Sequence, residues 1–332
     1  METDQDKLLA LIYTGDETNI RLALQMGRAT GVDMQSVYRQ LQDCVDFLET
    51  HYKVALSIPE IIRRAKTDGL SLSFSALHEL PSFLKILAPI TKKFDIFFNY
   101  LDEVPDVILH FRDLEYLNIA GNNLIKIPDA IWDFKQLKSL YLEDNMILRI
   151  SDRIERLTNL ERLGFAALYS LRLPEALFQL KKLQQLVISF NTKSKFPEEI
   201  CQLKTLTLLH FYGKHLTEIP ETIGQLTNLE EIYIADSSLS GLPNSLENLD
   251  NLKKLHLRSL LDLRQIPPAV FKLKNLEFLS LEDSPLHELS PSVRHLHQLK
   301  ELVLKGTTIF PDTKQQWSKR LAAWLPNTKI IW

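Results

Sequence analysis

The chain repeats one pattern of apolar residues at a nearly constant interval. The run that begins at Leu114 has leucine or isoleucine at its positions 1, 4, 6 and 11 and asparagine at position 9, and Ile127-Pro128 follows. The pattern restarts at Leu137, 23 residues later. A fixed period of about 20 to 29 residues is typical of stacked repeats, in which each unit buries its apolar residues against its neighbours. We therefore expect an array rather than one closed core.

Extending this interval in both directions predicts eleven units, of which the last is truncated. Most steps are 23 residues, and the first and ninth contain one extra residue. The units begin at Thr67, Thr91, Leu114, Leu137, Leu160, Leu183, Leu206, Leu229, Leu252, Leu276 and Leu299. Positions below are counted from these starts.

Each unit has a strand half and a turn half. The apolar residues at positions 4 and 6 alternate, so on a short strand they point to the same side, into the core. Ile-Pro, as in Ile127-Pro128, suits the start of a helical turn, because proline lacks an N–H and has a fixed φ. The pattern predicts an α/β solenoid with a curved parallel β-sheet on its concave face and short helical or 3-10 segments on its convex face.

Position 9 is occupied by residues that can satisfy backbone groups in the turn after the strand. Asparagine occurs here at Asn99, Asn122, Asn145 and Asn191, and Ser75, Ser237, Ser284 and Thr307 replace it with hydroxyls. Leu168, Lys214 and Leu260 interrupt the series. We expect local irregularity near residues 166–171 and 258–264.

The two ends of the chain do not fit the repeat. Residues 1–66 contain three amphipathic segments with N-cap residues and predict a helical cap. After the array of residues 67–310, residues 311–332 combine a helix candidate, containing Trp317, Leu321 and Trp324, with a short β-prone segment. Because a terminal repeat exposes an apolar flank, we interpret this region as a C-terminal cap.

Composition restricts the class of protein. The net charge of −3 gives no reason to expect nucleic acid or an anionic membrane as a partner. The chain has only two cysteines, Cys44 and Cys201, which favours a reducing compartment. An acidic start and a short apolar run at Leu8–Ile12 predict no signal peptide, and no apolar run reaches transmembrane length. We expect a soluble, cytoplasmic monomer.

The full pattern L-x-x-L-x-L-x-x-N-x-L-x-x-[IL]-P-x-x-[IL]-x-x-L, over about residues 67–310, resembles the intracellular leucine-rich repeat proteins of the Ras-suppressor and plant Ras-group type, and bacterial proteins built alike. The resemblance implies a concave β-face that binds another protein. It also implies two narrower functions: regulation of a small GTPase-like signalling protein, or action as a secreted bacterial effector that binds a host protein.

Motifs of enzyme chemistry are absent from the sequence. It contains no phosphate-binding glycine loop, no H-E-x-x-H and no G-x-S-x-G. His295 and His297 fall on the convex half of a unit, and His210 and His256 fall on strands about 10 Å apart, too far for one zinc ion to bridge without distortion. Only about twenty residues follow the last unit, so we expect no catalytic domain after the array. No cofactor or metal ion is predicted.

The concave face carries the candidate binding residues. Positions 3, 5, 7 and 8 point away from the core, and aromatic residues, histidine and arginine gather there. The predicted partner-binding residues are Tyr116, Tyr141, His210, Tyr212, Tyr233, His256 and Arg258. Phe74, Phe98 and Phe190, at position 8, are instead expected to turn into the core. The function predicted from the sequence is a non-enzymatic protein–protein interaction module.

Overall fold

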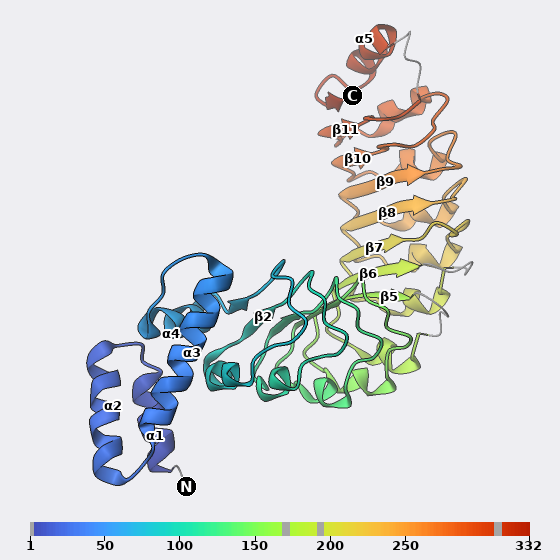
Figure 1. Ribbon diagram of the computed structural model, residues 1–332. Helices are drawn as coiled ribbons and strands as arrows, with labels where there is room; N and C mark the ends of the chain where they lie inside the picture. Colours follow the sequence, from blue (N-terminus) through green and yellow to red (C-terminus); the bar gives the residue numbers. More distant parts are fainter. Residues whose placement is uncertain (1–2, 168–172, 191–195, 309–313) are drawn as a thin grey trace. The chain divides into compact units, whose positions relative to one another are not determined.

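The structure, a computed structural model, describes residues 3–167, 173–190, 196–308 and 314–332 (Figure 1). The chain divides into two compact units, Met1–Met146 and Ile147–Trp332. Both units are built from the predicted repeat, and each is described separately. The predictions made for Leu168 and Asn191 lie outside the described residues.

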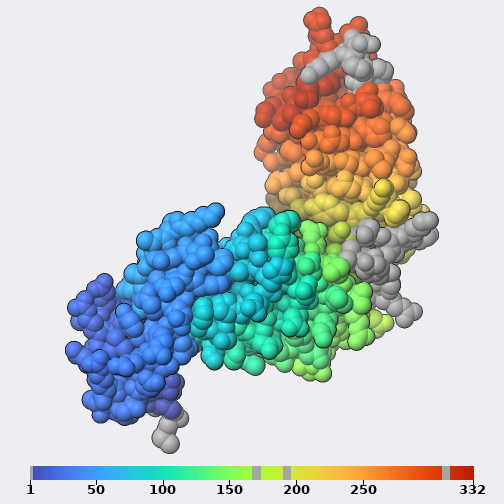
Figure 2. Space-filling view, viewed as in Figure 1, coloured from blue at the N-terminus to red at the C-terminus, as the bar shows by residue number. Residues whose placement is uncertain are grey.

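The first unit begins with four α-helices, which make up the blue part of the surface in Figure 2. Thr3, Asp16 and Asp33 cap the first three helices, because each side chain accepts a hydrogen bond from a backbone N–H of the first turn. The fourth helix ends at Thr67, which was predicted to be position 1 of the first repeat. Position 1 of this repeat is therefore helical. The helices are α1 (Asp4–Ile12), α2 (Glu17–Thr30), α3 (Met34–Tyr52) and α4 (Ile58–Thr67).

Four parallel strands follow in the first unit, paired in chain order. They are β1 (Leu70–Ser71), β2 (Lys93–Asp95), β3 (Tyr116–Asn118) and β4 (Ser139–Leu142). The chain returns between them through 3-10 helices at Ser82–Ile90, Asp106–His110 and Asp129–Asp133, each preceded by a proline. This confirms the predicted strand and turn halves of the repeat.

The second unit contains eight parallel strands, also paired in chain order wherever their register is described. The strands are β5 (Arg162–Ala167), β6 (Gln185–Phe190), β7 (Leu208–Tyr212), β8 (Glu231–Ser237), β9 (Lys254–Leu260), β10 (Phe278–Ser280), β11 (Glu301–Val303) and β12 (Lys329–Ile331). Seven 3-10 helices alternate with them, at Asp152–Arg156, Glu175–Gln179, Glu198–Gln202, Glu221–Gln225, Asn244–Asn248, Pro268–Lys272 and Pro291–His295. The parallel sheet and 3-10 segments confirm the predicted solenoid.

The position-9 residues join consecutive repeats. Asn122 is buried, and its Nδ2 donates to the carbonyl oxygen of Ile96 in the preceding repeat at 3.1 Å. Its Oδ1 accepts from the backbone N of Leu101, also in the preceding repeat, at 3.1 Å. Ser284 reproduces part of this pattern, because its Oγ accepts from Leu260 N and donates to Leu257 O. The hydroxyl of Ser237 is buried without a hydrogen-bond partner among the described residues.

The backbone at position 8 adopts a left-handed conformation in most units. Positive φ angles occur there at Gly121, Asp144, Asp236, Ser259, Asp283 and Gly306, and also at Phe74 and Phe98. Glycine enters this region freely and aspartate tolerates it, whereas a bulky aromatic residue there costs about 1 to 3 kcal/mol. Phe74 and Phe98 are therefore strained residues in a turn that suits smaller side chains.

The prediction that Phe74 and Phe98 enter the core is wrong. Phe74 is 69% exposed and Phe98 is 56% exposed. The left-handed backbone at position 8 turns the side chain away from the interior, which positions 4 and 6 already fill, as Phe94 and Ile96 do at 0% exposure. The side chain of Phe190 lies outside the described residues.

The predicted irregularity near residues 258–264 is small. Strand β9 continues to Leu260, which is buried, and Ser259 takes the left-handed conformation. Near residues 166–171, most of the predicted region lies outside the described residues.

The C-terminal end of the second unit covers the last repeat. Helix α5 (Lys314–Trp324) buries Leu321 completely, leaves Trp317 7% exposed, and is followed by strand β12. Strand β12 pairs with β11, and the backbone N of Leu304 donates to Ile331 O at 2.6 Å. This arrangement satisfies the free edge of β11, as expected of a cap.

Candidate functional site

Four predicted site residues of the second unit form one cluster on the exposed face of strands β7, β8 and β9. The strand register places Tyr233 directly between His210 and His256. The ring of Tyr233 lies 5.2 Å from the His210 ring, 5.1 Å from the His256 ring and 5.4 Å from the Tyr212 ring, centroid to centroid. We call His210, Tyr212, Tyr233 and His256 the tyrosine–histidine cluster.

Phe278 extends this cluster on the next strand. Its ring centroid is 4.6 Å from that of His256, the shortest of these ring contacts. All five rings are partly exposed. Contacting rings restrict one another's rotation, so the cluster is a preorganised surface rather than a set of independent side chains.

A carboxylate lies between the two histidines. Oε1 of Glu231 is 3.0 Å from His210 Nε2 and 3.9 Å from His256 Nε2, while its Oε2 is 3.3 Å from Lys254 Nζ. Glu231 is at position 3 of the same strand as Tyr233 and is 21% exposed. The two histidine strands are separated by one strand, as predicted, but both imidazoles turn toward this shared carboxylate.

Burial decides the charge of these groups. Burial lowers the pKa of His210, although its bond to Glu231 acts in the opposite direction. Burial also lowers the pKa of His256, and repulsion from His210 and Lys254 lowers it further, whereas the negative charge of Glu231 raises it. Burial disfavours ionisation of Glu231, but hydrogen bonds to His210 and Lys254 outweigh it and lower the pKa. At neutral pH both histidines are therefore mainly neutral beside an ionised carboxylate.

Arg258 lies at the end of the cluster and is 48% exposed. A side-chain hydrogen bond with Tyr233 raises the pKa of Arg258, and the charge of Glu282 raises it further. Its Nε is 3.8 Å from Glu282 Oε2 and 3.7 Å from Asp283 Oδ2. The guanidinium thus adds a cationic group that is already oriented by two carboxylates.

The remaining two predicted residues, Tyr116 and Tyr141, lie in the first unit. They occupy adjacent strands, and their ring centroids are 5.5 Å apart. The Tyr116 hydroxyl donates to Asp95 Oδ2 at 3.4 Å. The predicted residues therefore form two groups, one in each unit.

Sequence reasoning did not select Glu231, Lys254 or Phe278 as site residues. All three are at position 3 of consecutive repeats, which faces the same side as position 5. The sequence did contain an indication of this contact. Glu231 is at position 3 of one repeat, and the two flanking repeats have His210 and His256 at position 5. The choice of rotamer that directs both imidazoles to it is a property of the folded sheet.

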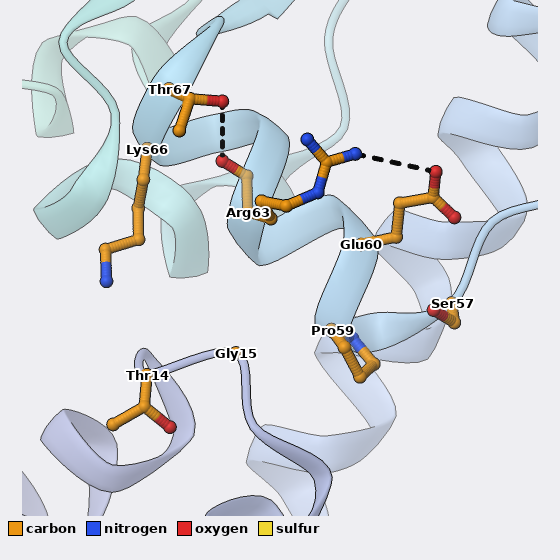
Figure 3. Close-up of a pocket in the computed structure, with 8 residues that line it drawn as sticks. All are labelled: Thr14, Gly15, Ser57, Pro59, Glu60, Arg63, Lys66 and Thr67. Atoms are coloured by element: carbon orange, nitrogen blue, oxygen red, sulfur yellow. Dashed lines mark hydrogen bonds and ion pairs between the residues drawn. The ribbon is translucent and has the colours of Figure 1, made fainter.

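A hollow of about 580 Å³ between α4 and the turn after α1 is the main alternative site in the first unit (Figure 3). Its two cationic groups already have partners: Lys66 Nζ donates to Tyr13 O at 2.9 Å, and Arg63 is 3.8 Å from Glu60. Figure 3 shows the Arg63 guanidinium pointing toward Glu60 rather than toward Thr14 and Gly15. The hollow offers few uncommitted groups to a ligand, so it does not support an enzyme or small-ligand site in the cap.

Metal and thiol chemistry have little support in the described parts of the chain. Within the described ranges no three histidine, cysteine or acidic residues are placed to hold a metal ion. Cys44 and Cys201 are both free and buried, and burial raises the pKa of each thiol, that of Cys44 to about 12. Thiols with a raised pKa are poor nucleophiles at neutral pH. None of the described helices has both the length and the apolar character that a membrane span requires.

Comparison with known proteins identifies the repeat. A family model described as leucine rich repeat matches residues 91–147. A leucine-rich repeat protein of Leptospira interrogans is 25% identical, with a TM-score of 0.60, over 79% of this chain and 71% of its own. An internalin of Listeria monocytogenes has the same fold at 16% identity, with a TM-score of 0.56, over 76% of this chain and 70% of its own. The curated proteins contain no match.

These findings agree with the observed architecture. The period, the parallel strands and the 3-10 segments occur in both units, and asparagines join consecutive repeats in the first unit. The fold generally mediates protein–protein interaction, and its members are typically non-enzymatic. The chain is a leucine-rich repeat protein.

Proposed function

We propose that this protein is a non-enzymatic interaction module whose main binding surface in the second unit is the tyrosine–histidine cluster with Arg258. The observation that carries the proposal is the position of Tyr233, whose ring centroid lies within 5.4 Å of those of three other rings while the residue stays partly exposed. Tyrosine and arginine dominate the binding energy of protein interfaces, especially when neighbouring groups hold them in place. The likeness to other leucine-rich repeat proteins supports a protein as the partner.

The electrostatics favour a partner with both apolar and polar contact groups. The two histidines are mainly neutral near pH 7, so the cluster offers uncharged rings around the Glu231 carboxylate, with Arg258 and Lys254 at its edge. Interfaces with an aromatic centre and a charged rim follow this pattern. Both histidines take up protons only at acidic pH, because burial lowers their pKa values from 6.5. The charge of the partner decides whether this protonation strengthens or weakens binding.

The test begins with a partner captured by the full chain from native lysate and purified. Tyr233→Ala should weaken its binding by about 2 kcal/mol or more, and His256→Ala should weaken it measurably. Tyr38→Ala and His295→Ala are matched controls, because Tyr38 is an exposed residue of α3 and His295 is an exposed residue of a 3-10 helix. Both should leave the Kd unchanged. If all four variants bind the partner with equal affinity, the tyrosine–histidine cluster is not the site.

We also propose that the protein acts as a monomer in a reducing, cytoplasmic environment. The support is that Cys44 and Cys201 are free thiols, 0% and 3% exposed, in different compact units. Light scattering should give the mass of one chain with and without reductant. A dimer that dissociates in reductant would contradict the proposal.

A further inference from the structure

The first unit carries three phenylalanines where the strands β1 and β2 end. Phe74 and Phe98 are at position 8 of adjacent repeats, and Phe97 is at position 7. The ring of Phe74 lies 5.3 Å from that of Phe98 and 5.2 Å from that of Phe97, and the rings of Phe97 and Phe98 are 5.8 Å apart. We call these three residues the aromatic platform.

The platform is exposed although its residues are apolar. Phe74 is 69% exposed, the largest fraction among the exposed large apolar residues of the described chain, and Phe98 is 56% exposed. Next to them, the ring of Tyr100, 50% exposed, stacks on His78 with 5.3 Å between centroids. Single exposed apolar side chains are ordinary, but a contiguous group of aromatic rings marks an interaction surface.

The backbone beneath the platform gives a second, independent indication. Phe74 and Phe98 have φ of 56°, in the left-handed region that disfavours bulky side chains. The equivalent residue of the third repeat is Gly121, which meets this geometry without strain. A side chain that is neither buried nor suited to its backbone does not stabilise the fold, and strain of this kind is concentrated at ligand-contacting positions.

The next repeat places a glycine beside the platform. A Cβ on Gly121 would lie 3.1 Å from Cδ2 of Phe98 and 3.2 Å from its Cα, so a larger residue there would require Phe98 to shift. One repeat further, the same positions hold the carboxylates Glu143 and Asp144. Positions 7 to 10 of these four repeats contain no lysine or arginine. The surface is therefore a set of ring faces with acidic groups at one side.

We propose that the aromatic platform is a second docking surface, and that its occupant is a segment of a partner protein with arginine or lysine beside an aliphatic side chain. The cation would lie over the ring faces, whose quadrupole attracts it, and would meet the exposed Asp144 across Gly121. The aliphatic side chain would cover the exposed edges of Phe74 and Phe97. This surface is separate from the tyrosine–histidine cluster, because it lies wholly in the first unit.

The position of Asp144 supports a cationic occupant. Asp144 is exposed and holds position 8 of the repeat that follows Gly121. Its carboxylate is therefore accessible to an incoming guanidinium or ammonium group. The acidic rim also disfavours the alternative occupant, an anionic membrane surface, through like-charge repulsion.

The first experiment separates binding from folding. Phe74→Asn and Phe98→Asn remove the rings but place a residue that tolerates left-handed φ in the turn. The melting temperature of the full chain should stay the same or rise in both variants, and Tyr38→Asn, on exposed α3, is the matched control. A fall of more than about 5 °C, at roughly 2 to 4 °C per kcal/mol for chains of this size, would show that the rings stabilise the fold and would overturn the proposal.

The second experiment identifies the chemistry of the occupant. A phage-displayed library of random twelve-residue peptides is selected against the full chain, with the Phe74→Asn/Phe98→Asn variant as competitor. Sequences enriched in arginine or lysine next to leucine, isoleucine or valine are expected. A synthetic peptide from this set should bind the double variant at least tenfold more weakly, and Asp144→Asn should weaken it as well.

Several outcomes would overturn the proposal. Selection that yields no discriminating peptide, peptides without basic residues, or equal binding to the double variant would each do so. Vesicles of phosphatidylcholine with phosphatidylserine are the membrane probe and should not bind. Vesicle binding that is lost in Phe98→Asn would assign the platform to a lipid surface instead. Binding at the tyrosine–histidine cluster is measured separately with Tyr233→Ala, so failure of one site does not imply failure of the other.

Discussion

Glu143 offers the most direct test of the electrostatics of the first unit. Burial raises the pKa of its carboxyl from 4.5 to about 7, and the charge of Asp144 contributes in the same direction, against backbone hydrogen bonds at Glu143 and Leu142. In the unfolded chain the same carboxyl ionises near 4.5. Between these two values the unfolded state loses a proton that the folded state keeps. The carboxyl therefore contributes its full stabilisation at low pH and loses it as the pH rises to about 7.

The magnitude follows from the two pKa values. At about 1.4 kcal/mol for each tenfold change in an acid constant, a rise from 4.5 to about 7 corresponds to about 3 kcal/mol. Glu143 keeps some contact with solvent, which screens part of this effect. We expect Glu143→Gln to leave the free energy of unfolding nearly unchanged at pH 4.5 and to raise it, relative to the natural chain, by about 1.5 to 3 kcal/mol at pH 8.

The assay is urea denaturation of the full chain from pH 4.5 to 8, followed by tryptophan fluorescence and by hydrogen exchange of peptides covering residues 137–146. Trp132, 1% exposed, is the only tryptophan of the first unit and reports its unfolding, while hydrogen exchange localises the effect to β4. Glu103→Gln is the matched control, because Glu103 is exposed and lies in the same unit. If Glu143→Gln and the natural chain show the same pH dependence, the carboxyl is not desolvated and the reasoning fails.

Three further predictions concern the repeat, the cap and the second unit. Asn122→Ala should lower the free energy of unfolding, measured by urea denaturation, by about 2 kcal/mol or more, because it leaves Leu101 N and Ile96 O without their hydrogen-bond partner. Asn123→Ala, at a less buried site, is the control. Leu321→Ala should cost about 2 to 5 kcal/mol by differential scanning calorimetry, since this side chain is completely buried, and an unchanged melting temperature would mean that α5 is not a cap. The second unit should lose stability as the pH falls below 6.5, because the lowered pKa values of His210 and His256 mean that the unfolded chain takes up protons first. A His210→Gln/His256→Gln variant should lose less between pH 7 and 5, and an equal loss would contradict the assignment of this effect to the histidines.

The period of the sequence was sufficient to predict the architecture, because a repeat encodes each unit through local rules. Alternating apolar residues define a strand, a proline starts the turn that follows, and a short polar side chain closes the loop. The strand and turn halves predicted for Leu114 to Phe134 are therefore observed in the first unit, and the same two halves recur in the second unit. The faces of the strands were equally predictable, so Tyr233 was correctly placed between two histidines.

The side chains at position 8 required the tertiary structure. The sequence shows phenylalanine at residues 74 and 98 and glycine at residue 121, and an apolar residue by itself suggests burial. The folded turn takes a positive φ, which points the side chain out of a core that positions 4 and 6 have already filled. Other repeats have glycine or aspartate at position 8, which is the sequence feature that indicates a turn there. That this turn exposes the side chain follows only from the positive φ of the folded backbone.

The candidate sites could likewise be predicted only in part from the sequence. Strand periodicity alone places His210, Tyr233 and His256 on the same face, because successive side chains of a strand alternate sides. Whether the two imidazoles turn toward Glu231, and whether burial keeps them neutral, depends on rotamers and on the packing of neighbouring side chains. The same holds for Glu143, whose charge is decided by the desolvation that only neighbouring repeats impose. The sequence by itself determined the fold and the faces of its strands, and the tertiary structure decided which side chains meet and which of them are charged.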